Sequence, residues 1–188
     1  ASVALLRQSA SFAGRAEDSS AFLRRCTSRC VRAAMRVRAA DADQWQALHE
    51  NPDDLVPAAV SEALRFEPIT PFTARQLTED VEYRDVTFPA GTVLVVCSFT
   101  GTRDSEAFEN PQDFDILIER DRTRPLTFGA GIHYCVGANL ARAELEEGLR
   151  FFAERIEKIE LNGMTELQAV SGIYGIDRMD VRIQPVSE

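Results

Sequence analysis

A glycine-rich run containing one cysteine stands immediately ahead of a long amphipathic pattern. The run reads Phe128-Gly-Ala-Gly-Ile-His-Tyr-Cys-Val-Gly137. From Ala138 to about Lys158, apolar residues recur every three or four positions, which predicts a helix with one apolar face. The sequence therefore predicts a tight loop that presents Cys135 just before the first turn of a helix.

A sulfur in that position has a restricted chemistry. The first N–H groups of a helix lack partners within the helix, and the helix dipole is positive at this end, so both stabilise an anionic sulfur at Cys135. The flanking glycines let the backbone pass close to a flat, bulky group or turn where a Cβ would clash. Phe128 is placed to shield the sulfur from water, and His133 to donate an N–H to an anionic group. We interpret Cys135 as a ligand or a nucleophile; the alternative is an ordinary buried cysteine.

Three segments carry a family resemblance. The run resembles the haem-binding loop of the cytochrome P-450 family, whose pattern Phe-x-x-Gly-x-x-x-Cys-x-Gly is met by Phe128, Gly131, Cys135 and Gly137. The family's Glu-x-x-Arg motif matches Glu62-Ala-Leu-Arg65, a spacing that puts both side chains on one helix face. Phe72-Thr-Ala-Arg75 resembles the stretch in which an Arg contacts a haem propionate. The chain is thus similar to the C-terminal part of bacterial, soluble members.

The resemblance implies a fold, a cofactor and a reaction. The expected fold is the haem-binding portion of the P-450 fold, mainly α with small β-sheets (α+β). Cys135 would be the catalytic residue, as axial ligand to the iron of haem b. The reaction implied is insertion of one oxygen atom of O2 into a small organic substrate, with electrons from NAD(P)H through a ferredoxin-type redox partner. The implied cofactor-binding residues are Cys135, Phe128, Gly129, Gly131, His133, Gly137 and Arg75.

Two of the matched sites keep a plainer interpretation open. By resemblance Glu62 and Arg65 are structural and help to hold the haem-side core. Without the resemblance, the same pair suits a solvated helix face, and Arg75 a solvent-facing side chain. Arg142, seven residues after Cys135, either meets an acidic redox partner or is an ordinary surface residue.

Local patterns predict the remaining elements. The apolar stripe before Pro68 favours a helix that ends near that proline. The predicted elements are helices at 41–49 and 55–66, a β-hairpin formed by the runs 81–88 and 92–97 around Pro89-Ala-Gly91, an irregular segment over 103–127, and strands at 156–161 and 181–183.

Residues 1–40 differ from the rest of the chain. They carry eight arginines and two acidic residues (+6), whereas residues 41–188 carry thirteen basic and twenty-eight acidic residues (−15), which sum to the net charge of −9. Apolar spacing over 22–37 suits a basic amphipathic helix. The resemblance covers 41–188 only, so we interpret 1–40 as an unmatched basic segment from a junction, a misread frame or an incomplete record, and we favour the last two.

Because the resemblance covers only part of the family's length, the sequence leaves one main alternative to a monooxygenase. The family's long central helix, with its acid and Thr for dioxygen protonation, is expected just before Asp41, and residues 1–40 contain no match to it. The alternative is a non-catalytic haem-binding fragment without monooxygenase turnover. Within the matched part, Ile118 stands near a family Arg, leaving Arg120 or Arg122 as substitutes, and Arg124 stands where many bacterial members have His.

Composition excludes several other classes. With 45% hydrophobic and 27% charged residues the chain is globular, and four cysteines are too few for a disulfide framework, which favours a reducing, cytoplasmic compartment. No apolar run is long enough to span a bilayer, so no membrane partner is expected. The basic residues of 1–40 lack aromatic interleaving, so no nucleic acid is expected. Cys26 and Cys30 with His49 would lack a fourth zinc ligand, and small residues on a helix face are the preferred interpretation.

Overall fold

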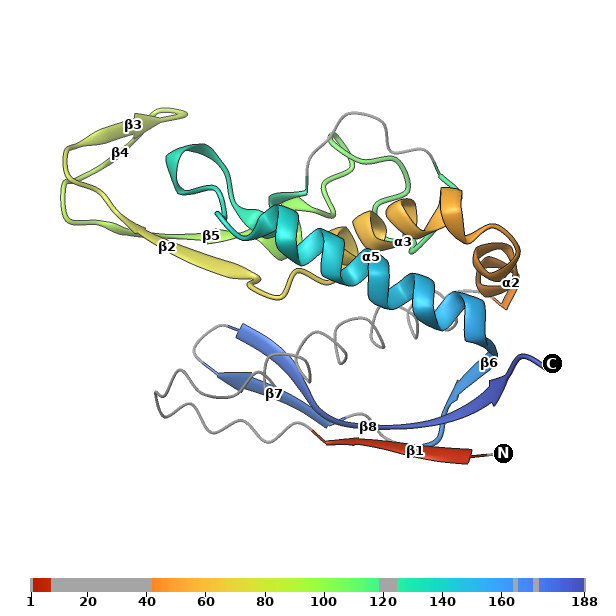
Figure 1. Ribbon diagram of the computed structural model, residues 1–188. Coiled ribbons are helices and arrows are strands. Elements are labelled where there is room, and N and C mark those ends of the chain that lie inside the picture. Colours follow the sequence, from red (N-terminus) through yellow and green to blue (C-terminus); the bar gives the residue numbers. More distant parts are fainter. Residues whose placement is uncertain (1, 8–41, 119–124, 164–165, 171–172, 188) are drawn as a thin grey trace.

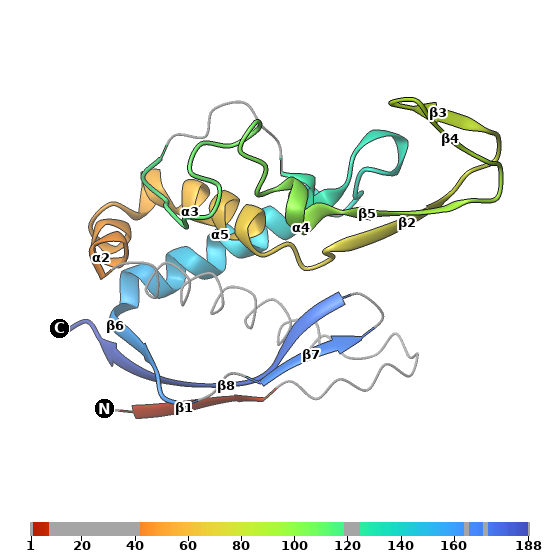
Figure 2. The ribbon, with the colours of Figure 1, turned by 180° about the vertical axis from the view of Figure 1, so that it is seen from behind.

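The computed structural model describes residues 2–7, 42–118, 125–163, 166–170 and 173–187 (Figure 1). A layer of helices lies above a curved four-stranded sheet, and two further two-stranded sheets extend from the far end of the helices (Figures 1 and 2). The predicted mixture of helices with small β-sheets is confirmed.

The helical layer contains α2 (Ala42–Glu50), α3 (Pro52–Phe66) and α5 (Ala138–Arg155). All three were predicted, to within three residues at either end. α3 begins earlier than expected because Pro52 occupies the first turn, where its missing N–H costs no hydrogen bond. α5 ends earlier because the chain becomes extended at Ile156.

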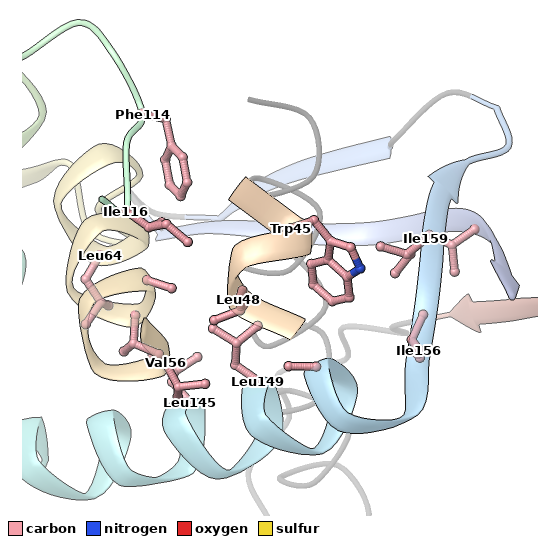
Figure 3. Packing of buried hydrophobic residues seen from close by; sticks show 14 of the residues in the cluster. Trp45, Leu48, Val56, Leu64, Phe114, Ile116, Leu145, Leu149, Ile156 and Ile159 are labelled. Atoms are coloured by element: carbon pink, nitrogen blue, oxygen red, sulfur yellow. The ribbon is translucent and has the colours of Figure 1, made fainter. Parts of the chain in front are cut away.

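One buried apolar cluster joins the helices to the sheet (Figure 3). Leu48 of α2, Val56 of α3 and Leu149 of α5 are completely buried in it. Each such side chain stabilises the fold by about 1.5–3 kcal/mol relative to exposure. The indole N–H of Trp45 donates to the Glu157 carbonyl at 3.1 Å, which ties α2 to the strand that follows α5.

The four-stranded sheet is built around its longest strand, β8 (Ile173–Pro185). β1 (Ser2–Arg7), β6 (Ile156–Leu161) and β7 (Glu166–Val170) each pair with β8 in antiparallel fashion. The predicted strands at 156–161 and 181–183 are confirmed, the second as one part of β8. The amphipathic helix predicted over 22–37 lies outside the described residues, and the boundary at residues 40 and 41 stays a prediction.

The hairpin predicted between 81–88 and 92–97 is wrong. β3 (Val81–Tyr83) and β4 (Val86–Phe88) pair with each other across Arg84 and Asp85, whose φ values of 48° and 64° suit a two-residue hairpin turn. β5 (Val93–Cys97) pairs instead with the earlier β2 (Phe72–Gln76). The chain thus turns inside the first run, and the Pro89 to Gly91 turn returns it to β2.

Short elements connect these parts. α4 (Ser98–Gly101) follows β5, and the 3-10 helices η1 (Leu126–Phe128) and η2 (Gly131–His133) precede α5. In the predicted irregular segment, residues 103–118 contain neither helix nor strand, and the short η1 begins near its end, at Leu126. Within the described residues, no helix combines the length and the apolar character needed to cross a bilayer.

Candidate functional site

The loop that carries Cys135 is closed by its own backbone. The Cys135 N–H donates to the Phe128 carbonyl at 2.9 Å, and the Tyr134 N–H donates to the Gly131 carbonyl at 3.0 Å. Gly129 and Gly131 have φ values of 72° and 70°, a region that side-chain-bearing residues rarely adopt. The predicted tight loop before a helix is therefore present. The positive φ values explain why positions 129 and 131 are glycine.

Cys135 is solvent-exposed at the point where the loop meets α5. The Ala138 N–H, in the first turn of α5, donates to the Cys135 carbonyl at 3.2 Å. This first turn contains no acidic residue. Cys135 thus lies at the N-terminal end of α5, which is the positive end of the helix dipole. Gly137 is the N-cap residue of α5, and a Cβ placed on it would be 3.9 Å from the Cys135 sulfur, an ordinary contact.

Large apolar side chains surround Cys135 in the sequence and remain exposed. Ile132 and Val136 are almost completely exposed, and Tyr134 and Leu140 are 44% and 61% exposed. Ile132, Tyr134 and Val136 belong to the loop and Leu140 to the first turn of α5, and exposed apolar side chains close together in the chain are characteristic of a ligand or partner site. A thiol between such side chains, ahead of a helix, suits a flat apolar group that takes a sulfur ligand. The residues present therefore fit a haem.

Two predicted cofactor contacts are on the surface. His133 is an exposed residue of η2. Arg75 is exposed on β2, opposite Leu94 of β5, and its Nη1 donates to the adjacent Ala74 carbonyl at 2.8 Å. Both side chains are exposed, and the predicted contacts of Arg75 with a haem propionate and of His133 with an anionic group stay predictions.

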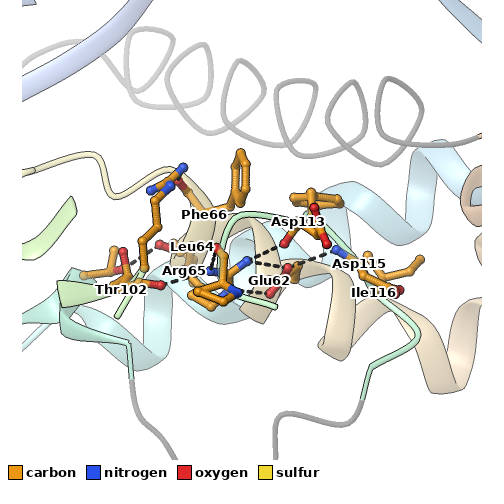
Figure 4. A network of polar contacts seen from close by, with 12 residues as sticks. Glu62, Leu64, Arg65, Phe66, Thr102, Asp113, Asp115 and Ile116 are labelled. Carbon is orange, nitrogen blue, oxygen red and sulfur yellow. Dashed lines mark hydrogen bonds and ion pairs between the residues drawn. The ribbon is translucent and has the colours of Figure 1, made fainter. Parts of the chain in front are cut away.

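Glu62 and Arg65 form a buried ion pair on α3, as their spacing predicted (Figure 4). Their side chains are 4% and 1% exposed, and two hydrogen bonds of 2.7 Å join them. The remaining guanidinium hydrogens are donated to the carbonyls of Thr102, Pro111 and Asp113 at 2.8–2.9 Å. This is a side-chain network that fastens irregular backbone to α3, and a solvated pair is excluded.

A backbone group completes this network. The Asp115 N–H donates to Glu62 Oε1 at 3.0 Å. Ile118, at the position of the expected family Arg, is half-buried. The suggested substitutes Arg120 and Arg122, and Arg124, lie outside the described residues.

Sequence reasoning missed several polar contacts near the site. Arg103 donates to the Phe66 carbonyl at 2.6 Å and lies over the rings of Phe66 and Phe99, at 4.2 and 3.9 Å from their centroids. Thr127 donates to the Leu64 carbonyl at 2.5 Å and fastens η1 to α3. The sequence carries no signal for the two hydrogen bonds, because their acceptors are backbone carbonyls 37 and 63 residues away along the chain.

The zinc site that the sequence made unattractive would involve Cys26, Cys30 and His49. Cys26 and Cys30 lie outside the described residues, and His49 Nδ1 is 2.5 Å from the Ala153 carbonyl oxygen. Among the described residues, no group of three His, Cys, Asp or Glu side chains is arranged to hold a metal ion.

Cys97, at the end of β5, has no role in the predicted site. Its hydrogen bond with the Thr100 side chain lowers the pKa of its thiol.

Comparison with known proteins places these features in a family. A family model described as Cytochrome P450 matches residues 26–153. Luteothin monooxygenase of Streptomyces thioluteus is 37% identical over 150 residues, which cover 79% of this chain and 36% of the relative. Vitamin D(3) 25-hydroxylase of Pseudonocardia autotrophica is 38% identical over 149 residues, covering 77% of this chain and 36% of the relative. The chain thus spans about a third of the length of these curated relatives.

Solved structures agree with the sequence matches. The structure of P450BioI in complex with an acyl carrier protein superposes with a TM-score of 0.77 and 28% identity, over 87% of this chain and 42% of that chain. The structure of CalO2 gives a TM-score of 0.76 and 30% identity, over 88% of this chain and 41% of that one. Family pattern, sequence and fold lead to one conclusion: the chain belongs to the cytochrome P450 family.

Proposed function

We propose that this chain is the haem-binding part of a P450 monooxygenase and that the Cys135 thiolate is the axial ligand of the haem iron. The observation that carries the proposal is the closed loop that holds an exposed Cys135 at the N-terminal end of α5, among exposed apolar side chains. Haem b is the cofactor of this family, and when bound it supplies the chemistry that inserts one oxygen atom of O2 into an organic substrate.

The other loop residues have supporting roles in the proposal. Phe128 fixes the Cys135 N–H through its carbonyl, and its half-buried ring packs against the apolar core. Gly129 and Gly131 hold the loop in a conformation that a Cβ would strain. Gly137 leaves the backbone beside the sulfur without a side chain. His133 and Arg75 are proposed to bind the two propionates, Arg75 with the planar fork that suits a carboxylate.

We propose the substrate and the redox partner by chemical class. The relatives' names refer to luteothin, vitamin D(3) and a mycaminosyltylactone, so they do not single out one substrate class. P450BioI was solved with an acyl carrier protein. We propose a small organic substrate and electrons from NAD(P)H through a ferredoxin-type partner. A cytoplasmic location stays a prediction.

A second candidate function is haem binding without monooxygenase turnover. The chain spans about a third of its relatives' length, and β5 keeps Val93, Val95 and Val96 exposed by 60%, 64% and 46%. A bound haem that is open to water on one side loses reducing equivalents instead of passing them to substrate. We therefore expect the 188-residue chain alone to bind haem and to release hydrogen peroxide with little or no product.

The carbon monoxide difference spectrum of the reduced, haem-reconstituted chain tests the proposal. We expect the strongly red-shifted Soret band of thiolate ligation in the wild type and in Cys97→Ala, which keeps Cys135. The band should be lost in Cys135→Ala. A wild-type spectrum without this band, or a band that survives Cys135→Ala, would show that Cys135 is not the ligand. Coupled, substrate-dependent hydroxylation by the same chain would overturn the second candidate.

A further inference from the structure

Arg142 contacts the segment that carries Cys135 from the second turn of α5. Its guanidinium carbon lies 5.4 Å from the centroid of the Phe128 ring, and its Nη1 donates to Ser61 Oγ of α3 at 3.3 Å. Side chains on a helix lean toward its N-terminus, so a residue in this turn reaches back to η1. Arg142 therefore joins three elements: η1, α3 and α5.

Phe128 links this contact to Cys135. The Phe128 carbonyl accepts the Cys135 N–H at 2.9 Å, and its ring meets the Tyr134 ring edge-on at 6.4 Å between centroids. The residue before it, Thr127, is fastened to α3 by the hydrogen bond to the Leu64 carbonyl. The ring that Arg142 contacts and the carbonyl that accepts the Cys135 N–H thus belong to one residue.

The ring of Phe128 gives the position of Arg142 a physical reason, because a guanidinium within about 6 Å of an aromatic centroid is attracted to the ring. Arg142 is the fifth residue of α5, beyond the first turn in which the helix dipole acts most strongly on a charge.

We propose that Arg142 is a positioning residue for the Cys135 loop, holding the Phe128 ring against α3 and α5 so that the Phe128 carbonyl fixes the Cys135 N–H. Its consequence for haem ligation rests on the proposed function. The contact itself exists in the chain without haem, so the two can be tested separately.

Hydrogen exchange of the haem-free chain tests the contact. We expect Arg142→Met to raise the exchange rate of the Cys135 amide several-fold, because its acceptor is no longer fixed. Arg142→Lys, which keeps the charge, should restore part of the protection. The matched control is Arg150→Met on the same helix, which loses an ion pair with Asp53 and should leave the Cys135 amide unchanged. Unchanged exchange in Arg142→Met, or an equal rise in Arg150→Met, would overturn the proposal.

A double-mutant cycle tests the route through Phe128. In the haem-loaded chain, Arg142→Met should speed the conversion of the thiolate-ligated to the thiol-ligated carbon monoxide spectrum several-fold. In a Phe128→Leu background the same substitution should have almost no further effect. Additive effects would show that Arg142 does not act through Phe128. If the wild type gives no thiolate spectrum, the proposed function fails, and hydrogen exchange alone decides the role of Arg142. Should Arg142→Met not fold, Arg142→Gln replaces it in both experiments.

Discussion

The Glu62–Arg65 network and the Cys135 loop are the two family motifs of this chain, and they are stabilised in different ways. The network is buried, and its charges and donors are satisfied by the chain's own side chains and carbonyls. The loop is exposed, is held by backbone hydrogen bonds, and presents uncovered apolar side chains. The network is complete in the chain alone, whereas in the proposed function the exposed side chains of the loop are covered by a bound haem.

The largest expected effect is on the network. Arg65→Met removes the guanidinium that neutralises the buried Glu62 carboxylate and donates to three carbonyls, which should destabilise the chain by about 3–5 kcal/mol. Urea unfolding measures the change. Arg75→Met, an exposed arginine on β2, is the control and should stay within about 0.5 kcal/mol of wild type. If Arg65→Met lowered the free energy of unfolding by less than about 1 kcal/mol, the buried network would not be a main source of stability. The contrast with the exposed loop would then fail.

Haem should stabilise the two motifs unequally. At a free haem concentration about 100 times its dissociation constant, binding adds about 2.7 kcal/mol to global stability. In hydrogen exchange we expect the loop amides of 128–137 to gain protection by local ordering. The α3 amides around Arg65 should gain no more than global stabilisation gives. Equal gains in both segments, or none in the loop, would contradict the account.

Replacing a loop glycine should lower the free energy of unfolding by a moderate amount. At Gly131 a Cβ meets nothing within 4 Å, but the φ of 70° is strained for any other residue, so Gly131→Ala should cost about 1 kcal/mol. The cost is measurable by urea unfolding of the haem-free chain. Ala130→Ser, in the same loop with a φ of −147°, should have almost no effect. If the two variants were equally stable, left-handed backbone would not be the reason for the glycine.

The smallest effect concerns the second described cysteine. The hydrogen bond with the Thr100 side chain lowers the pKa of the Cys97 thiol, so its thiolate forms at lower pH than that of an ordinary cysteine. Thr100→Val should raise this pKa and move the midpoint of Cys97 alkylation to higher pH. Peptide mass spectrometry separates the Cys97 peptide from the peptides of the other cysteines. An unchanged Cys97 profile would contradict the assigned cause.

Local patterns predicted the helices and the Cys135 loop because their signals lie within a few residues. The apolar stripe of α5 and the spacing of Glu62 and Arg65 required no distant partner. Strand pairing was mispredicted because the β3–β4 turn is formed by Arg84 and Asp85, which are not the usual pair of turn residues. Pro89 and Gly91 are typical turn residues, so the sequence placed the turn of the hairpin there instead. The acceptors of Arg65 were unpredictable because every residue has a carbonyl, and only the fold selects three of them.

Resonance Raman spectroscopy of the haem-reconstituted ferric chain tests the central claim most directly. Cysteine labelled with a heavy sulfur isotope should shift the iron–sulfur stretching band of the wild type and of Cys97→Ser. The band should be missing in Cys135→Ser. An isotope-sensitive band that persists in Cys135→Ser, or its absence from a wild-type chain that has bound haem, would contradict the assignment of Cys135 as the haem ligand.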